Sequence, residues 1–377
     1  MYLIFVGHYN IRPCKAQYLY WYLHMLEKFP DAYFVVTDDY LNFSTDRWEV
    51  QDKLKTKPTW KYVLPSNLVI TKKPEEIFKN VQNPSDILQE CVFNINYELD
   101  GKLEKIVREN KIDAIITCCN NKTLLEVGKE HDISVPVIHN EQGPLRPPFF
   151  NRTAYFDFSG VNGNTEFYRR FLKFKEIADN VKIFSREELL EIVTESKQLE
   201  YVRGLVNTKP IYNCGVALQV DVDTNMVAYN KGWSSADLVN KAMKKYGKVL
   251  IRNHPLASMQ YTATTSLGNG VVDTSKNSLE FISKCKKIMT INSSVAFEAM
   301  LMGREVEILG YSPFEHIPFM TSDDKLLALN FAIFSYLVPN KWWDDKKYIE
   351  FRLNEKNEEI LYSKGQKLVL GEINGNK

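Results

Sequence analysis

Two short polar motifs in the second half of the chain have residue types that can hold a phosphate group. Asn292-Ser293-Ser294 follows the expected strand Lys287–Ile291 and opens the expected helix Ser293–Met302. Backbone amides at a helix N-terminus attract anions, and the serine hydroxyls add further donors. His254-Pro255 also follows an expected strand, and its imidazole can donate to a phosphate. Either motif alone could be structural, as a serine cap or a packed histidine, but the pair favours a phosphate site.

A third polar motif, Gln219-Val220-Asp221-Val222-Asp223, comes after another expected strand and has three interpretations. Asp221 and Asp223 would share one side of an extended chain and could form a DxD metal motif. A calcium loop is the second interpretation, but Met226 stands at the sixth position, where glycine is required. In the third, Asp221 is a catalytic carboxylate and Gln219 is its neighbour on the same side. The residues alone leave these alternatives open.

Two charged residues in the second half of the chain could help to bind the ligand whose phosphate the serine and histidine motifs would hold. Glu298 lies on the second turn of the helix that opens with the serine pair. It could accept hydrogen bonds from ribose hydroxyls, or it could be a solvated helix carboxylate. Arg252 ends the strand before the histidine motif and is a further donor-binding candidate.

The proline-rich segment 140–151 in the first half carries candidates of the same kind. Glu141 could act as a general acid or base if it faces a cleft. Arg146, or Arg152 just after the segment, could pair with the carboxylate of an acidic sugar. A turn with a surface salt bridge is an equal alternative.

Composition and missing motifs narrow the class of protein. The net charge of +1, from 48 basic and 47 acidic residues, gives no general attraction for nucleic acid. The sequence has no GxGxxG, P-loop, GxSxG or HExxH motif, which weakens dehydrogenase, ATPase, esterase and metalloprotease interpretations. The sequence contains no apolar run of 18 residues, so no membrane span is predicted. The first residues are typical of a strand and not of a signal peptide. The cysteines contain no CxxC pair and are expected to be buried, reduced thiols: Cys14, Cys91, Cys118, Cys119, Cys214 and Cys285.

The elements that must position these residues alternate between short β-rich runs and amphipathic helices, which indicates parallel sheets with crossover helices. The expected elements of the first half are strands Tyr2–Val6, Tyr33–Thr37, Ala114–Thr117 and Val135–His139, and helices Cys14–Lys28, Asp100–Asn110, Leu124–His131 and Thr165–Phe174. Arg186–Arg203 is expected to be one long charged helix that could link two domains.

A second α/β series is expected from residue 211 onward. Its expected strands are Val216–Val220, Lys248–Arg252, Gly270–Asp273, Lys287–Ile291 and Glu305–Leu309, and its helices are Ala236–Tyr246, Ser278–Lys284 and Ser293–Met302. Gly303 is placed to end the last of these helices. Ligands of open α/β sheets bind beyond the carboxyl ends of the strands, so the informative loops follow Ile138, Val220, Arg252 and Ile291.

A chain of 377 residues is long enough for two domains. We expect an N-terminal, acceptor-side Rossmann-like domain over residues 1–185 and a Rossmann-like donor domain over 186–340. Residues 341–377 are expected to form a helical tail that could pack back on the N-terminal domain. In that tail, Lys341-Trp342-Trp343 could touch a lipid surface, and a capped helix is an equal alternative.

The order and spacing of these motifs resemble the retaining β-Kdo glycosyltransferases of bacterial O-antigen and capsule assembly. The resemblance consists of Glu141 in NEQGPLR, Gln219 and Asp221 in a QxD motif, His254-Pro255 as an HP motif, and SSVAFEAMLMG at 293–303. It covers roughly residues 140–315 and is most specific over Ser278–Gly310. The first 130 residues match only in their general α/β pattern.

The resemblance implies a GT-B-like α/β fold, with two Rossmann-like domains whose parallel sheets face a central cleft. It implies a CMP-β-Kdo donor, with CMP held by the HP and serine motifs and no bound metal or other cofactor. Asp221 would be the nucleophile of a retaining reaction, and Glu141 would assist proton transfer. The acceptor would be a glycan, expected to be lipid-linked, of lipopolysaccharide O-antigen or capsule. Such an enzyme would be cytoplasmic, with peripheral contact at the inner membrane, and would not bind nucleic acid.

Other functions remain open at this point. A transferase that uses CMP-sialate or a UDP-sugar is the main enzymatic alternative, and an epimerase of similar fold is less favoured. A nucleotide-sugar binding module without catalysis is the alternative that is not an enzyme. A dead module would have little reason to keep Asp221 beside Gln219 and the phosphate motifs.

Overall fold

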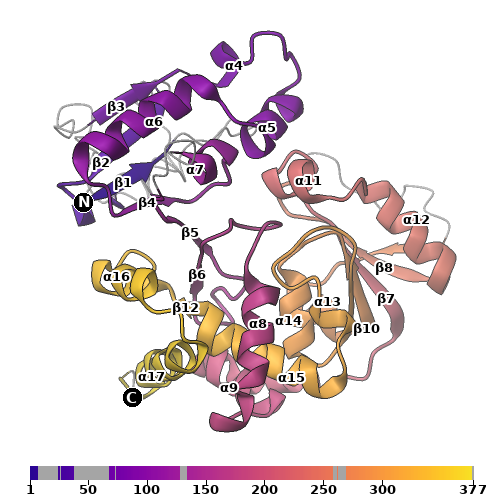
Figure 1. Cartoon of the computed structure of the whole chain (residues 1–377). Helices are drawn as coiled ribbons and strands as arrows, with labels where there is room; N and C mark the ends of the chain where they lie inside the picture. Colours follow the sequence, from indigo (N-terminus) through magenta and orange to yellow (C-terminus); the bar gives the residue numbers. More distant parts are fainter. Residues whose placement is uncertain are drawn as a thin grey trace. The chain divides into compact units, whose positions relative to one another are not determined.

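The chain forms two compact units in the computed structural model, which describes residues 1–6, 24–25, 27–37, 68–72, 74–127, 134–257, 261 and 269–375 (Figure 1). Unit 1 consists of Met1–Glu141, Asp157–Val161 and Asp344–Asn354. Unit 2 consists of Gln142–Phe156, Asn162–Trp343 and Glu355–Lys377. These bounds differ from the expected domain limits, because residues 142–156 and 162–185 cluster with unit 2. The assignment of acceptor and donor domains stays a prediction.

Unit 1 is built on parallel strands in the order β5-β4-β1-β2-β3. Their bounds are β1 Tyr2–Phe5, β2 Tyr33–Thr37, β3 Leu68–Thr71, β4 Ala114–Thr117 and β5 Val137–Gln142. All four residues of β1 are buried, as are all four of β4. Strands that are apolar on both faces are typical of a parallel sheet covered by helices on both sides.

The longest described helix of unit 1 shows how its core forms. The helices in the described part of this unit are α4 Pro74–Ile77, α5 Pro84–Phe93, α6 Tyr97–Asn110, α7 Lys122–Glu126 and α16 Lys346–Asn354. In α6, Leu99, Leu103, Ile106 and Val107 recur at helical spacing and pack in one cluster with residues of β1, β2 and β4. Asn96 caps this helix by accepting the backbone N–H groups of its first turn.

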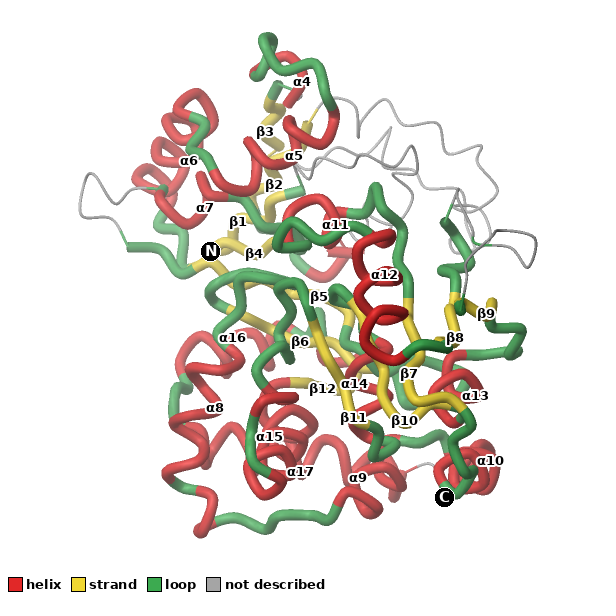
Figure 2. The backbone as a smooth tube through the Cα atoms, turned by 90° about the vertical axis from the view of Figure 1, so that its right-hand side faces the viewer, coloured by secondary structure: helices red, strands yellow, loops and turns green. Residues whose placement is uncertain are grey.

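Unit 2 contains a five-stranded parallel sheet in the order β11-β10-β7-β8-β9 (Figure 2). The bounds are β7 Tyr212–Ala217, β8 Val249–Arg252, β9 Gly270–Val272, β10 Cys285–Thr290 and β11 Glu305–Ile308. The chain adds β8 and β9 on one side of β7 and then returns to place β10 on the other side. The order therefore reverses between β7 and β10, and such a switch point is where open α/β sheets bind ligands.

Helices around this sheet position its loops. They are α11 Thr224–Tyr229, α12 Ser235–Tyr246, α13 Ser278–Ser283 and α14 Val295–Leu301. Leu238, Val239 and Ala242 of α12 pack against residues of β7, β8 and β10 in one buried cluster. Gly303 follows α14 with a positive φ of 74°, a conformation that favours glycine and that confirms its expected place at the helix end.

The remaining part of unit 2 is mostly helical and has an aromatic core. Its elements are α8 Phe167–Glu176, α9 Arg186–Val193, α10 Leu199–Val206, α15 Ser322–Phe331 and α17 Glu358–Gly375, with most of β6 Thr153–Asp157 and the antiparallel β12 Leu337–Pro339. Phe167 contacts the rings of Phe314, Phe331 and Tyr336 edge to face at 5.0–5.2 Å.

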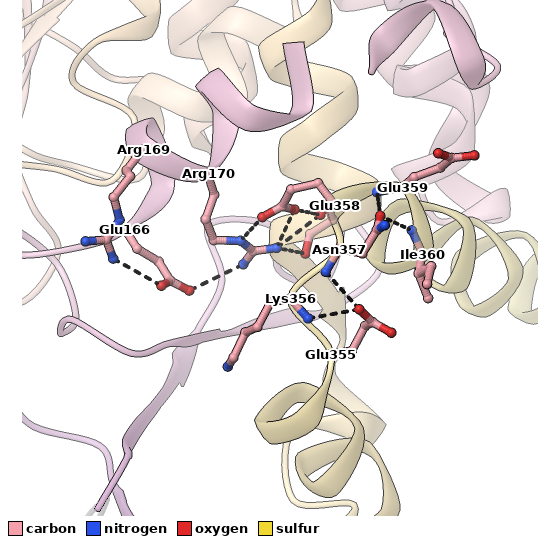
Figure 3. Close-up of polar contacts among 10 residues, drawn as sticks. Glu166, Arg169, Arg170, Glu355, Lys356, Asn357, Glu358, Glu359 and Ile360 are labelled. Carbon is pink, nitrogen blue, oxygen red and sulfur yellow. Dashed lines mark hydrogen bonds and ion pairs between the residues drawn. The ribbon is translucent and has the colours of Figure 1, made fainter. Parts of the chain in front are cut away.

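A buried ion pair attaches the C-terminal helix α17 to α8 (Figure 3). Arg170 of α8 donates from Nε to Oε1 of Glu358 over 2.7 Å and from a terminal nitrogen to Oε2 over 3.0 Å. That terminal nitrogen also donates to the backbone oxygen of Ser335 over 3.1 Å. Both charged residues are at most 7% exposed, so the start of α17 has a fixed partner.

The predicted α/β class with two sheets is confirmed: strands β1 to β5 of one sheet and β7 to β11 of the other are parallel, while β6 and β12 form an antiparallel pair. The finer prediction of a GT-B-like arrangement stays a prediction. Strands expected at Tyr33–Thr37 and Ala114–Thr117 have the predicted bounds. The expected helix Leu124–His131 corresponds in its first part to α7, and its residues from 128 onward lie outside the described part. Most of the expected helix Cys14–Lys28 also lies outside it.

The single long helix expected over Arg186–Arg203 is wrong. The structure has α9 and α10 instead, with an interruption at residues 194–198. Thr194 forms an antiparallel bridge with Phe150, and the N–H of Glu195 donates to the backbone oxygen of Phe149 over 2.8 Å. These contacts with the proline-rich segment satisfy backbone groups that a continuous helix would pair internally.

Two further properties concern thiols and membranes. The five described cysteines are free thiols, and Cys14 lies outside the described residues. No helix in the described part of the chain has the length and apolar character needed to cross a membrane.

Candidate functional site

The loops after β7 and β10 are joined directly at the switch point of the unit 2 sheet. The backbone N–H of Asn292 donates to Oε1 of Gln219 over 3.2 Å. The side-chain amide of Asn292 donates to the backbone oxygens of Asn225 over 2.9 Å and Tyr229 over 3.2 Å. The QxD motif and the serine motif, joined by residues that are 73 positions apart in the sequence, therefore lie together with α11.

The serine pair divides into a capping residue and an exposed one. Ser293 accepts the N–H of Val295 at Oγ over 3.3 Å, and its own N–H donates to Oγ1 of Thr290 over 3.2 Å. Ser294 occupies the cap position of α14, makes no side-chain cap hydrogen bond and is exposed. The hydroxyl of Ser294 can therefore meet a ligand at the edge of the sheet.

Asp221 lies in the loop after β7 and is exposed to solvent. Oδ1 of Asp221 accepts a hydrogen bond of 2.6 Å from the hydroxyl of Ser235, the first residue of α12. Burial raises the pKa of Tyr261, and the negative charge of Asp221 raises it further, so these two side chains are close. Asp223 precedes α11 at its cap position. The described residues contain no group of three His, Cys, Asp or Glu side chains arranged to hold a metal ion.

The HP motif follows β8 at the same edge of the sheet. Nδ1 of His254 accepts the backbone N–H of Leu256 over 3.1 Å. A ring nitrogen that accepts carries no proton, so the neutral imidazole has its proton on Nε2, which is a donor. Asn253 and Tyr261 bond reciprocally, at 2.7 and 3.0 Å, and hold the residue before the histidine in place.

Glu298 is a half-buried residue whose carboxyl group is partly shielded from water, which argues against a freely solvated surface carboxylate. Its Oε2 is inaccessible to solvent and has no hydrogen-bond partner among the described residues. Burial raises the pKa of this carboxyl to about 7, against the opposing effects of a hydrogen bond from Ser278 and the charges of Arg146 and Arg252. Both arginines therefore lie near Glu298.

Hydrogen bonds to other residues hold the side chains of Arg252 and Arg146. Arg252 donates to Oδ2 of Asp273 over 2.6 Å and to the backbone oxygen of Ser275 over 3.2 Å. Arg146 donates from Nε to the backbone oxygen of Gly143 over 3.2 Å. Arg252 thus has a carboxylate partner inside the protein, which makes Arg146 the better candidate for an acidic ligand. The donor-binding roles of both residues stay predictions.

Glu141 belongs to unit 1, at the end of β5. Burial raises the pKa of the Cys118 and Cys119 thiols, and the charge of Glu141 raises it further, so this carboxylate lies near the loop after β4. Asn120 fixes that loop through two hydrogen bonds of 2.7 Å with the backbone of Val161. Glu141 therefore lies beside a firmly held loop at the carboxyl edge of the unit 1 sheet.

A solvent-open pocket lies at the carboxyl ends of β1, β2 and β3 in unit 1. Its lining combines an apolar floor with amides, hydroxyls and two lysines, among them Phe5, Thr71, Lys72, Asn96, Lys102 and Asn121. The lysines both pair with Glu98. Amides and hydroxyls of this kind can exchange hydrogen bonds with sugar hydroxyls.

With this geometry established, comparisons with known proteins become informative. Residues 4–166 match the glycosyltransferase 99 family N-terminal domain. This match supports a glycosyltransferase and includes Glu141, Arg146 and Arg152, but it ends before the QxD, HP and serine motifs. None of the curated proteins that were compared matches the chain.

Solved structures give similarities at low identity. The β-Kdo 2,7 transferase KpsC of Thermosulfurimonas dismutans is 15% identical, covers 64% of this chain and 82% of its own, and has a TM-score of 0.38. The β-Kdo 2,4 transferase KpsC of the same organism is 14% identical, with coverages of 65% and 88% and a TM-score of 0.40. UDP-GlcNAc 2-epimerase of Methanocaldococcus jannaschii is 14% identical, with full coverage of both chains and a TM-score of 0.30.

Sequence reasoning missed four residues of the unit 2 site: Ser235, Tyr261, Asp273 and Ser278. The sequence Ser234-Ser235-Ala236-Asp237 contains a helix-capping signal, but it gives no indication that one serine would reach Asp221. The sequence also gives no indication that Asp273, just after β9, would pair with Arg252 at the end of β8. No local pattern reveals such pairs.

Proposed function

We propose that this protein is a retaining glycosyltransferase that moves Kdo from CMP-β-Kdo to an acceptor of bacterial lipopolysaccharide O-antigen or capsule. The observation that carries the proposal is the hydrogen bond between Asn292 and Gln219 at the switch point of the unit 2 sheet. It joins a motif suited to phosphate with a motif that carries an exposed carboxylate. The match of residues 4–166 to a glycosyltransferase family domain supports the same class of reaction.

Donor binding in this proposal uses groups from three segments of unit 2: residues 142–156, the loop after β8, and the start of α14 with its cap. The hydroxyl of Ser294 and Nε2–H of His254 donate to the CMP phosphate. The half-buried carboxyl of Glu298, whose Oε2 has no partner among the described residues, accepts from the ribose hydroxyls. Arg146 pairs with the carboxylate of Kdo, because planar guanidinium and carboxylate groups match as bidentate partners.

The reaction proceeds through two displacements at C2 of Kdo. Oδ2 of Asp221 attacks C2, and the bond between C2 and the phosphate oxygen breaks, with its electron pair leaving on CMP. Fixed donors around the phosphate stabilise the negative charge that develops there. The acceptor hydroxyl then attacks C2 and displaces the carboxylate of Asp221, while Glu141 takes the hydroxyl proton. Two inversions restore the starting configuration.

The acceptor side of the proposal uses unit 1. The pocket at the carboxyl ends of β1 to β3 has the amides, hydroxyls and apolar floor that a sugar requires. The acceptor glycan is proposed to be lipid-linked, which would bring a cytoplasmic enzyme into peripheral contact with the inner membrane. The chemistry needs no metal, because fixed donors stabilise the leaving phosphate.

The test is turnover of a panel of donors by the purified protein. CMP-Kdo, CMP-sialate and UDP-GlcNAc are incubated separately with the wild type, and released nucleotide is measured with and without excess EDTA. We expect release of CMP from CMP-Kdo alone, unaffected by EDTA. Intact-protein mass spectrometry with CMP-Kdo should show a sugar adduct on the peptide that contains Asp221.

Asp221→Asn and Asp223→Asn form a matched pair for the same experiment. Asp221→Asn keeps the shape of the side chain and removes its charge, so it should bind CMP but lose transfer by several orders of magnitude. Asp223→Asn should keep near-normal activity. Near-normal turnover by Asp221→Asn would refute the nucleophile, turnover of UDP-GlcNAc alone would refute the donor, and loss of activity in EDTA would restore the DxD metal interpretation.

A further inference from the structure

The hydroxyl of Ser235 contacts the proposed nucleophile and is not needed by its own helix. The capping box of α12 is complete without it, because Oγ of Ser234 accepts the N–H of Asp237 over 3.1 Å and Asp237 accepts the N–H of Ser234 over 3.1 Å. Ser235 instead donates 2.6 Å to Oδ1 of Asp221, fourteen residues earlier. Two adjacent serines therefore have separate roles.

The position of Ser235 is set by a rigid element. The apolar face of α12, with Leu238, Val239 and Ala242, is buried against β7 and β8. This packing places the first turn of α12 beside the loop that carries Asp221. The donor is thus held by the core of unit 2, while the acceptor lies on an exposed loop.

An exposed aspartate needs a hydrogen bond of this kind if one of its carboxylate oxygens is to be held in position for attack. Rotation of a carboxyl group about its last torsion is broad and costs little energy. A hydrogen bond to Oδ1 fixes this rotation and directs Oδ2 away from Ser235. A nucleophile held in the attacking geometry gains rate because the orientation is set before the reaction, and a small misplacement can cost about 100-fold.

We propose that Ser235 is the positioning residue of Asp221, presenting Oδ2 to the anomeric carbon of the donor. This inference rests on the proposed function. In the first step Ser235 keeps its bond to Oδ1 while Oδ2 forms the ester with C2. In the second step the bond from C2 to Oδ2 breaks, its electron pair returns to the carboxylate, and Ser235 again donates to Oδ1. The hydroxyl transfers no proton in either step.

The experiment compares Ser235→Ala, Ser235→Thr and Ser234→Ala with the wild type. Four quantities are measured: kcat and KM for CMP-Kdo, the rate of adduct formation at Asp221, the affinity for CMP, and Tm. Ser235→Ala should lower kcat and the adduct rate by about 10-fold to 100-fold with CMP affinity and Tm unchanged. Ser235→Thr keeps a hydroxyl and should restore most of both rates. Ser234→Ala loses the helix cap and should lower Tm while kcat stays near normal.

The outcomes separate this inference from the function on which it rests. An adduct that forms at Asp221 in the wild type and at the same rate in Ser235→Ala overturns the positioning role alone. A Ser235→Thr variant as slow as Ser235→Ala also overturns it, because the hydroxyl would then not be the active group. Absence of any adduct or CMP release in the wild type overturns the proposed function, and the role of Ser235 falls with it.

Discussion

Asn292 donates its backbone N–H to Oε1 of Gln219 over 3.2 Å, and this bond connects the loops after β10 and β7. The bond lies between the two strands at which the order of the unit 2 sheet reverses. Gln219 precedes Asp221 by two residues, so the bond ties the serine motif to the loop that carries the proposed nucleophile.

Loss of this bond should weaken nucleotide binding. Gln219→Leu leaves the N–H of Asn292 without its acceptor, at a cost of about 1–2 kcal/mol, which corresponds to a roughly 5-fold to 30-fold loss of CMP affinity. Ser322→Ala, outside the site, is the control. Isothermal titration calorimetry with CMP measures both variants. Wild-type affinity in Gln219→Leu would show that the bond does not shape the site.

The HP and serine motifs should both contribute to CMP binding. His254→Ala and Ser294→Ala are each expected to reduce the binding free energy by about 1.5–3 kcal/mol, the value of a hydrogen bond to a charged group. Ser322→Ala, at the start of α15 and outside the site, serves as the control. Calorimetry and Tm are measured together. Unchanged CMP affinity in both site variants would refute a phosphate site at these motifs.

Glu298 should make the stability of the protein depend on pH. Burial raises the pKa of its carboxyl from 4.5 to about 7, so between these values the folded state holds the proton more firmly than the unfolded state. The free energy of unfolding therefore contains a contribution that is complete below pH 4.5 and is lost as pH rises through 7.

Glu298→Gln removes this dependence because the amide stays neutral. Its stability relative to the wild type should increase by about 3 kcal/mol between pH 4.5 and pH 8, given about 1.4 kcal/mol per pKa unit. Urea denaturation at several pH values measures the difference, and Glu305→Gln, an exposed residue of β11, is the control. Parallel pH curves for Glu298→Gln and the wild type would contradict the assignment of a carboxyl shielded from water.

The buried pair of Arg170 and Glu358 should be important for stability. Arg170→Met leaves Glu358 buried without its partner and should lower the free energy of unfolding by about 3–5 kcal/mol. The double variant Arg170→Met with Glu358→Met removes both charges and should recover much of this loss. Arg203→Met breaks solvent-screened ion pairs at the surface and should leave the free energy of unfolding nearly unchanged. An Arg170→Met variant no less stable than Arg203→Met would contradict the prediction.

Local patterns in the sequence determined which segments become strands and helices of the two sheets. Alternating apolar runs of the right length predicted β2, β4 and α12 to within a residue, because burial on both faces of a parallel strand and one face of a helix leaves a local signal. The same patterns marked the strand ends at which polar residues gather. The structure confirms one of the expected proximities, that of Gln219 and Asn292, and the place of His254 in the same site stays a prediction.

Tertiary structure decided the contacts that no local pattern encodes. The break between α9 and α10 comes from pairing of Thr194 with Phe150, and the partial burial of Glu298 comes from packing around α14. Ser235 reaches Asp221 only because α12 packs on β7 and brings its first turn to that loop. Hydrogen bonds between distant segments depend on where the core places each backbone. The periodicity of a sequence does not show which distant residues come close together in the fold.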